Sequence, residues 1–300
     1  MDSIQSFSAN INEPKQKKPK KGAGLGLLTF GLTVVPPFAI VSQMLGNKMI
    51  DLSKNLTADE FSQMEKIIAK TMETSGLKNK GVDIIKVTSE NKDEVLNIMR
   101  NAYKKSFIYK HVPQNIVELQ TGRNYMLLKD GLTALYLFPE KKILAPGDGL
   151  KLAIPHEMGH AINHNLSKFG KILQKCRTTA ILALPILLVA LFKNKKAPDE
   201  KPKNVFDKIT TFIKNHAPAL AIAAWLPTIC EEGLASIKGV KMIKNTKEIT
   251  PQLLKKVRIS NLLGLSTYVL IALLYGLGIY EASKVKDAVY HKNVEKMNMQ

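Results

Sequence analysis

Long apolar stretches alternate with lysine-rich polar stretches along this chain of 300 residues. The first apolar run covers 22–47 and the last covers 259–280, and each is long enough to cross a ~30 Å hydrocarbon core as an α-helix. Two shorter runs, 178–192 and 217–230, lie between them. The pattern predicts an integral, multi-pass membrane protein in which transmembrane segments 22–47 and 259–280 flank a membrane hairpin at 178–230.

Prolines interrupt several of these apolar runs. Pro36 and Pro37 remove helix hydrogen bonds near the middle of the first run, so we expect that segment to be kinked, broken or re-entrant. The two short runs give only ~22 Å of helix each, and both contain proline, so they either cross the membrane or form a shallow hairpin. In both cases the chain enters and leaves the hairpin on the same side.

Residues 48–177 are polar and carry the periodicities of a folded α+β domain. Thr57 and Glu60 form a capping box, and Phe61, Met64 and Ile68 mark one apolar face of the helix that follows. Runs of β-branched and aromatic residues bounded by turn signals predict strands. The further elements are a strand at 81–87, a helix at 91–103 and a β-hairpin formed by 132–139 and 142–145.

The candidate chemistry lies in the segment that follows this hairpin. Pro155 suits the first turn of a helix, because its missing N–H is no loss there, and we expect a helix from Pro155 toward Phe169. Within it, His156 and His160 are four residues apart on one face, with Glu157 beside them. Two neutral imidazoles can bind a Zn²⁺ that keeps one position open for water, and the carboxylate can take a proton from that water.

Two histidines do not complete a catalytic zinc site, so the chain must supply a third ligand. The metzincin pattern fails, because its Gly and His positions hold Asn163 and Leu166 here. His164 lies on the same helical face, about 6 Å beyond His160, too far for an undistorted tetrahedral site. We therefore expect His164 to be a supporting residue or an alternative ligand.

A pair of carboxylates follows the second short apolar run. Glu231 and Glu232 stand directly after residues 217–230. A charge at a membrane boundary is costly unless it has a partner, so we expect at least one of the two to bind the ion. The alternative is that both simply mark the end of the span in water. Because the membrane hairpin at 178–230 brings the chain back to the side of the membrane on which it started, either carboxylate can reach the histidine helix.

The first strand of the predicted β-hairpin, 132–139, lies just upstream of the histidine helix, where it can form the edge of a cleft. Such an edge binds an extended peptide by adding it as another strand. Ala134, Leu135 and Tyr136 are the candidate substrate contacts on this edge. A purely structural hairpin explains the pattern equally well.

Charge and cysteine content limit the partners. The formal charge is +19, yet the lysines are spread over every polar segment, so we expect no nucleic-acid binding. This charge suits contact with membrane lipids, with a disordered basic tail at 1–21 and a basic tail at 281–300. The two cysteines, Cys176 and Cys230, fit buried free thiols better than a disulfide.

Together these motifs resemble the membrane gluzincins that include HtpX and the CAAX prenyl protease. In outline the resemblance covers residues 22–280, and it implies an α+β zincin-like metalloprotease domain interwoven with transmembrane helices, mainly α in content. Ser236 stands where the family usually has Asp, so the support of the metal ligands must differ. The motifs that carry the resemblance are His156-Glu157-Met-Gly-His160 and Glu232-Gly-Leu-Ala235.

The resemblance also implies a role for each site residue. His156, His160 and Glu232 would bind one Zn²⁺ per chain. Glu157 would activate the water, and Glu231 would be a neighbour of the ligands. The family precedent places the site on the cytoplasmic face, whereas the even distribution of Lys and Arg does not distinguish the two sides.

The expected function is that of an integral-membrane zinc endopeptidase that hydrolyses membrane-associated or unfolded proteins. Residues 231–258 would then hold the third-ligand helix and a connector to the last span. The main alternative is a catalytically inactive zinc-binding membrane scaffold. A basic membrane-surface adaptor without metal is the third hypothesis.

Overall fold

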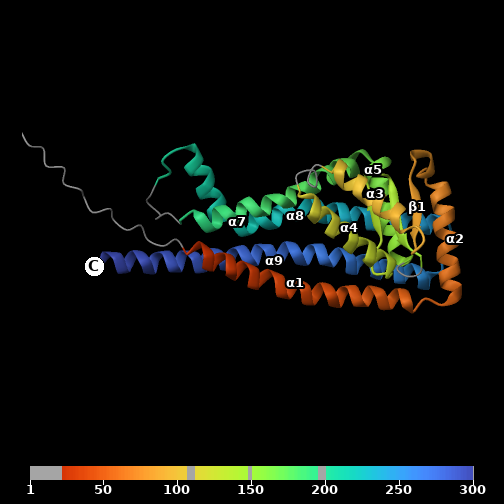
Figure 1. The fold of residues 1–300 in the computed structure, drawn as a ribbon, viewed down its shortest axis with the longest axis horizontal. Helices are drawn as coiled ribbons and strands as arrows, with labels where there is room; N and C mark the ends of the chain where they lie inside the picture. Colours follow the sequence, from red (N-terminus) through yellow and green to blue (C-terminus); the bar gives the residue numbers. More distant parts are fainter. Residues whose placement is uncertain (1–21, 107–111, 148–150, 195–200, 300) are drawn as a thin grey trace, which may run out of the picture.

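In a computed structural model, the chain forms a bundle of long helices with a small mixed domain at one end (Figure 1). The structure describes residues 22–106, 112–147, 151–194 and 201–299. The basic tail expected at 1–21 lies outside these ranges. Residues 195–200, in the loop of the expected membrane hairpin, also lie outside them. Helices predominate in the described part and its strands form one small sheet, so the expectation of a mainly α protein is confirmed.

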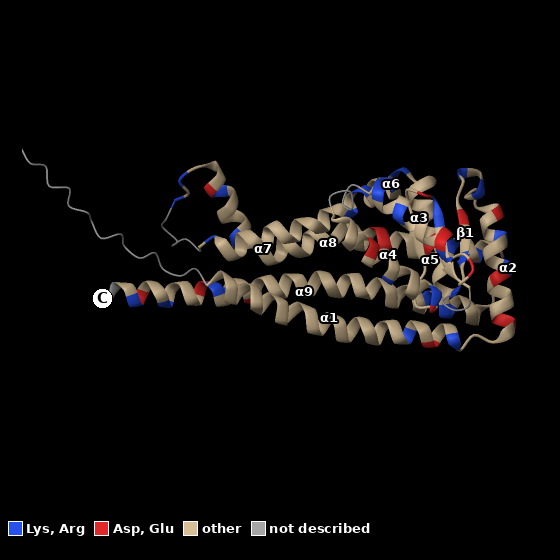
Figure 2. Ribbon diagram, viewed as in Figure 1, with Lys and Arg blue, Asp and Glu red and all other residues tan. Residues whose placement is uncertain are grey.

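Four helical segments are long and apolar enough to cross a membrane. Charged residues gather at the two ends of this bundle and leave its middle apolar (Figure 2). The mixed domain lies at one end, and the C-terminus lies at the other (Figure 1). The segments are α1 (Ala23–Lys54), then α6 (Lys168–Cys176) continued by η4 (Arg177–Leu182) and α7 (Ala183–Phe192), then α8 (Val205–Asn245) and α9 (Pro251–Asn298).

Internal prolines do not break these helices. α1 continues through Pro36 and Pro37, so the broken or re-entrant form of this segment is not observed. α8 likewise continues through its own two prolines and joins the short run at 217–230 to the expected third-ligand segment. Glu231 and Glu232 therefore lie inside one long helix instead of at the start of a separate one. Neighbouring helices stabilise α8 on both sides, which offsets the lost hydrogen bonds.

Both cysteines are free, as expected. Cys176 is partly buried, at the end of α6. Cys230 is exposed on α8, so the expectation that both thiols are buried is wrong for this residue. An apolar helix that crosses a membrane can place such a thiol against lipid.

The mixed domain begins with α2 (Ala58–Thr74), whose capping box is confirmed. Thr57 Oγ1 accepts a hydrogen bond from Glu60 N at 3.2 Å, and Thr57 N donates to Glu60 Oε2 at 2.9 Å. The predicted helical face buries Met64 completely against the sheet and the following helices. Two more helices follow, α3 (Lys92–Lys105) as expected and α4 (Gln114–Lys129), whose apolar residues show only weak helical periodicity and which was not predicted.

One three-stranded sheet completes the domain. Its strands are β1 (Asp83–Val87), β2 (Leu135–Leu137) and β3 (Lys142–Pro146), in the order β1-β3-β2. β2 and β3 form the predicted antiparallel hairpin, although β2 is shorter than the expected strand 132–139 and does not include Ala134. β1 pairs with β3 in parallel through a crossover that contains α3 and α4. β2 therefore has one free edge, as a peptide-binding strand requires.

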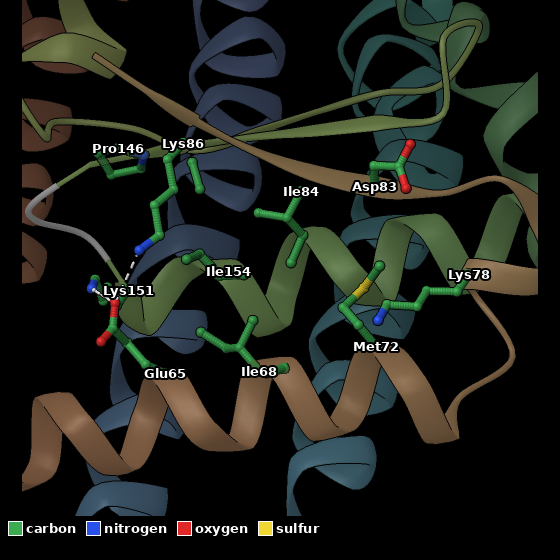
Figure 3. Close-up of a pocket in the computed structure, with 12 residues that line it drawn as sticks. Glu65, Ile68, Met72, Lys78, Asp83, Ile84, Lys86, Pro146, Lys151 and Ile154 are labelled. Atoms are coloured by element: carbon green, nitrogen blue, oxygen red, sulfur yellow. Dashed lines mark hydrogen bonds and ion pairs between the residues drawn. The ribbon is translucent and has the colours of Figure 1, made fainter.

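A cavity of about 510 Å³ lies between α2 and one face of this sheet (Figure 3). Ile84 and Ile154 form part of its apolar wall, and a cluster of charges closes one end. In this cluster Glu65 accepts hydrogen bonds from Lys86 at 3.2 Å and from Lys151 at 2.6 Å. None of the described residues that line this cavity is a histidine, so the candidate chemistry lies elsewhere.

Candidate metal centre

The motif histidines lie on α5 (Ile154–Asn165), and Pro155 is in its first turn as predicted. The helix ends at Asn165 and does not continue toward Phe169. The reason is local: Ser167 caps the next helix, and its hydroxyl accepts a hydrogen bond from Gly170 N at 3.1 Å. α5 is therefore a short helix that ends one turn after the second motif histidine.

α5 crosses α8 at two glycines where the backbones touch. A Cβ atom on Gly159 would lie 1.9 Å from the carbonyl oxygen of Ala235. A Cβ atom on Gly239 would lie 2.1 Å from the carbonyl oxygen of Pro155. No side chain fits at either position, so the two helices approach more closely than ordinary side-chain packing allows. This approach places the carboxylates of α8 beside the imidazoles of α5.

Three candidate ligand atoms meet at this crossing. The Nε2 atom of His156 lies 3.0 Å from Nε2 of His160 and 3.0 Å from Oε2 of Glu232. The third side of the triangle, from His160 Nε2 to Glu232 Oε2, is 3.4 Å. Ligand atoms bound at ~2.0–2.1 Å to a tetrahedral Zn²⁺ are about 3.3 Å apart. The three separations lie within about 0.3 Å of this value, so the three atoms can bind one tetrahedral ion.

The second nitrogen of each imidazole has its own partner. His156 Nδ1 lies 3.0 Å from the Ser236 hydroxyl, and His160 Nδ1 lies 2.9 Å from Oε1 of Glu231. Such contacts fix the ring orientation and leave Nε2 facing the centre of the triangle. Ser236 thus supplies a polar partner where the resembled family usually has Asp. Glu231 supports His160 from behind and is not one of the three converging groups.

Arg177, which the sequence did not single out, bridges the two carboxylates. One guanidinium nitrogen lies 3.0 Å from Oε2 of Glu231, and another lies 2.6 Å from Oε1 of Glu232. The contact holds the second oxygen of Glu232, Oε2, toward the histidines, and it offsets the charge of two carboxylates that are almost fully buried. A signal was present, because Arg177 directly precedes the apolar run at 178–192.

Replacing Arg177 with Met is expected to weaken zinc binding about 10- to 100-fold, because the supporting contact to Glu232 is lost. Competition with a chromogenic chelator measures the affinity. Lys175→Met is the matched control, since Lys175 is an exposed cation on the same segment. Equal zinc affinity in the two variants would contradict the role given to Arg177.

Glu157 lies on α5 next to the three ligand atoms. Its Oε2 accepts a hydrogen bond from the backbone N–H of Tyr136 on β2 at 2.7 Å. Burial raises the pKa of the Glu157 carboxyl above its usual value. A raised pKa makes the carboxylate a better proton acceptor, as a general base requires. The same hydrogen bond shows that the free edge of β2 faces this carboxylate.

His164 contacts the edge strand β2 and is not one of the three candidate metal ligands. Its Nδ1 lies 3.1 Å from the hydroxyl of Tyr136, which also accepts a hydrogen bond from Asn165 Nδ2 at 2.8 Å. The ring of Phe138 packs edge-on against His164. Burial lowers the pKa of His164 to about 4, so its ring is neutral at pH 7 and its Nδ1 can accept the hydroxyl proton. These contacts fasten β2 to α5.

A cavity of about 350 Å³ opens beside the three ligand atoms. The three predicted edge residues, Ala134, Leu135 and Tyr136, form one wall together with the motif residues of α5. Five residues of α9 and Met49 of α1 also line the cavity. The structure therefore brings the motif, the α8 carboxylate and the edge strand to one cavity.

Comparisons with known proteins found no matching family model, no matching curated protein and no matching solved structure.

Proposed function

We propose that this chain is an integral-membrane zinc endopeptidase that cleaves membrane-associated or unfolded proteins. The supporting observation is the triangle of candidate ligand atoms from His156, His160 and Glu232, whose sides of 3.0–3.4 Å are close to the ~3.3 Å separation of ligand atoms in a tetrahedral zinc site. Glu157 stands beside this triangle, and a free strand edge runs along the same cavity. The resemblance to HtpX and the CAAX prenyl protease gives these residues the same roles within a zincin-like domain.

Each side chain of the site has a separate role in peptide hydrolysis. A bound Zn²⁺ would polarise the scissile carbonyl and lower the pKa of a water molecule at the open position. Glu157 accepts the proton of that water and returns it to the leaving amine. Ser236 and Glu231 keep the two imidazoles in the ligating orientation, and Arg177 keeps Glu232 in place.

The free edge of β2 supplies the substrate contacts. Its backbone N–H at Tyr136 faces the cavity and is hydrogen-bonded to Glu157 before substrate binds. An extended peptide that pairs with β2 would take over this donor and release the carboxylate for proton transfer. The cavity is also lined by Met49 and Gly264, which belong to helices long enough to cross a membrane. This location favours substrates at the bilayer surface, on the cytoplasmic face by the family precedent.

Metal analysis combined with a cleavage assay tests the proposal. The purified full-length protein in detergent is expected to contain about one zinc per chain and to cleave denatured casein. A zinc chelator should abolish cleavage, and added Zn²⁺ should restore it. His160→Ala should lose both metal and activity. Stoichiometric zinc without cleavage under any condition would favour the inactive scaffold, and absence of metal would exclude both.

A further inference from the structure

The cavity beside the metal centre has a second wall that peptide hydrolysis alone does not explain. α9 forms this wall with Ser260, Asn261 and three further residues, among them Gly264. Ser260 is 1% exposed and Asn261 is 6% exposed, although the middle of α9 is apolar. Polar side chains buried in such a helix are costly unless they bind something.

The Ser260 hydroxyl has no hydrogen-bond partner among the residues that the structure describes. A serine within a helix usually donates to the carbonyl one turn back. Ser266 on the same helix does so, with Oγ 2.8 Å from the carbonyl oxygen of Leu262. Ser260 does not: its hydroxyl is buried without a partner among the described residues, and the residue is one of those that line the cavity. A buried hydroxyl without a partner in the chain is usually paired with a water molecule or a ligand.

A second unpaired group lines the same cavity from α6. The Oε1 atom of Gln174 is buried and has no partner in the described part of the chain. Asn261 adds an amide, whose Nδ2 makes only a 3.5 Å contact with the carbonyl oxygen of Ser236. Ser260, Asn261 and Gln174 therefore bring a hydroxyl, an amide and an unpaired acceptor to the lining of this cavity, and none of the three belongs to β2 or to the three candidate ligands.

An extended peptide in this cavity has two hydrogen-bonding edges. β2 can pair with one of them, since only one edge of β2 is already occupied by β3. The other edge still presents N–H and C=O groups, which are costly to leave unpaired in a cavity enclosed by apolar helices. Hydroxyl and amide donors suit its carbonyl groups, and the Gln174 oxygen suits its N–H groups.

We propose that Ser260, Asn261 and Gln174 form a main-chain clamp that hydrogen-bonds the outer edge of a substrate strand whose inner edge pairs with β2. The clamp rests on the proposed function and specifies the substrate class. Because it recognises backbone groups, it selects extended, unfolded segments with little regard to side chains. A helical segment satisfies its own backbone hydrogen bonds and is not a substrate until it unwinds.

Ester scanning of a bound peptide tests the clamp. The probe is a dansyl-labelled heptapeptide of alternating Ala and Leu, and its binding to zinc-loaded Glu157→Gln protein in detergent is followed by fluorescence. Replacing one peptide bond at a time by an ester removes one N–H donor. Successive N–H groups of a strand point to opposite edges, so a clamp makes neighbouring central positions sensitive, each by about fivefold. Recognition by β2 alone makes only every second position sensitive and would overturn the proposal.

Two variants connect this pattern to the side chains. Gln174→Met should remove the sensitivity of one alternating set of positions, and Ser260→Ala should weaken binding of the parent peptide about fivefold. Ser266→Ala is the matched control and should change neither, because its hydroxyl is already paired within α9. Unchanged binding in both test variants overturns the clamp, as does failure of the peptide to bind at all. If the clamp fails but the wild type cleaves casein, the proposed endopeptidase function still stands. If the peptide shows the clamp pattern but no cleavage occurs, the endopeptidase function is refuted and the clamp stands.

Discussion

Glu157→Gln protein is expected to retain about one zinc per chain and to cleave casein at least ~10²-fold more slowly than the wild type. The amide has the shape of the carboxylate, and its oxygen can still accept the hydrogen bond from Tyr136 N. Strand β2 and the metal ligands therefore stay in place. Only the ability to take a proton from the attacking water is lost, so the metal content should stay the same while the cleavage rate falls.

Elemental analysis and a casein cleavage assay on the same preparation show whether the Glu157→Gln protein keeps its zinc while it loses activity. Glu94→Gln serves as the control, because Glu94 is an exposed carboxylate on α3, away from the site. Wild-type cleavage by the Glu157→Gln protein would exclude Glu157 as the base. Loss of zinc together with activity would instead mean that Glu157 helps to hold the ion.

Gly159→Ala is expected to have the largest structural effect of any methyl addition in the site. The new Cβ would lie 1.9 Å from the Ala235 carbonyl oxygen, so α5 and α8 would have to separate. Overpacking of this kind typically costs about 1–3 kcal/mol in folding free energy. Separation also moves Glu232 away from the two histidines, so zinc affinity should fall at least tenfold. Gly239→Ala should have the same effect from the opposite helix.

Thermal unfolding and zinc competition measure the two consequences. Gly233→Ala on α8 is the matched control, because its nearest neighbouring atom would be 3.9 Å from the added Cβ. That substitution replaces a helical glycine without a clash and should leave stability equal or raise it by about 1 kcal/mol. A Gly159→Ala protein with the unfolding temperature and zinc affinity of the control would contradict the backbone contact between α5 and α8.

Local sequence signals predicted the parts of the site that depend on neighbouring residues. The capping box of α2, the β-hairpin and the start of α5 at Pro155 follow from residues within a few positions of one another. The meeting of one α8 carboxylate with the motif was also predictable, because a carboxylate at a membrane boundary needs a partner and the membrane hairpin at 178–230 returns to its starting side. The choice of Glu232 over Glu231 came from the resemblance to the membrane gluzincins.

Long-range features were not predictable from those signals. Arg177 takes its place only when α6 and α8 pack together, and the sequence shows merely a cation before an apolar run. The parallel pairing of β1 with β3 depends on a crossover that includes α4, whose apolar periodicity is weak. The prolines of α1 and α8 suggested breaks, but helix packing in the bundle outweighs the lost hydrogen bonds.

The ligand set is divided between segments that lie far apart in the chain. Glu232 is 76 residues from His156, and α6, α7 and most of the apolar part of α8 lie between them. A nascent chain that has not yet reached α8 therefore holds only two of the three ligands, and the Nδ1 partners of both histidines are also missing. Proteolytic competence, on the proposed function, is thus gained only at a late step of biogenesis, after the returning helix has packed against α5. On the same function, the order of synthesis would keep a half-inserted chain proteolytically inactive.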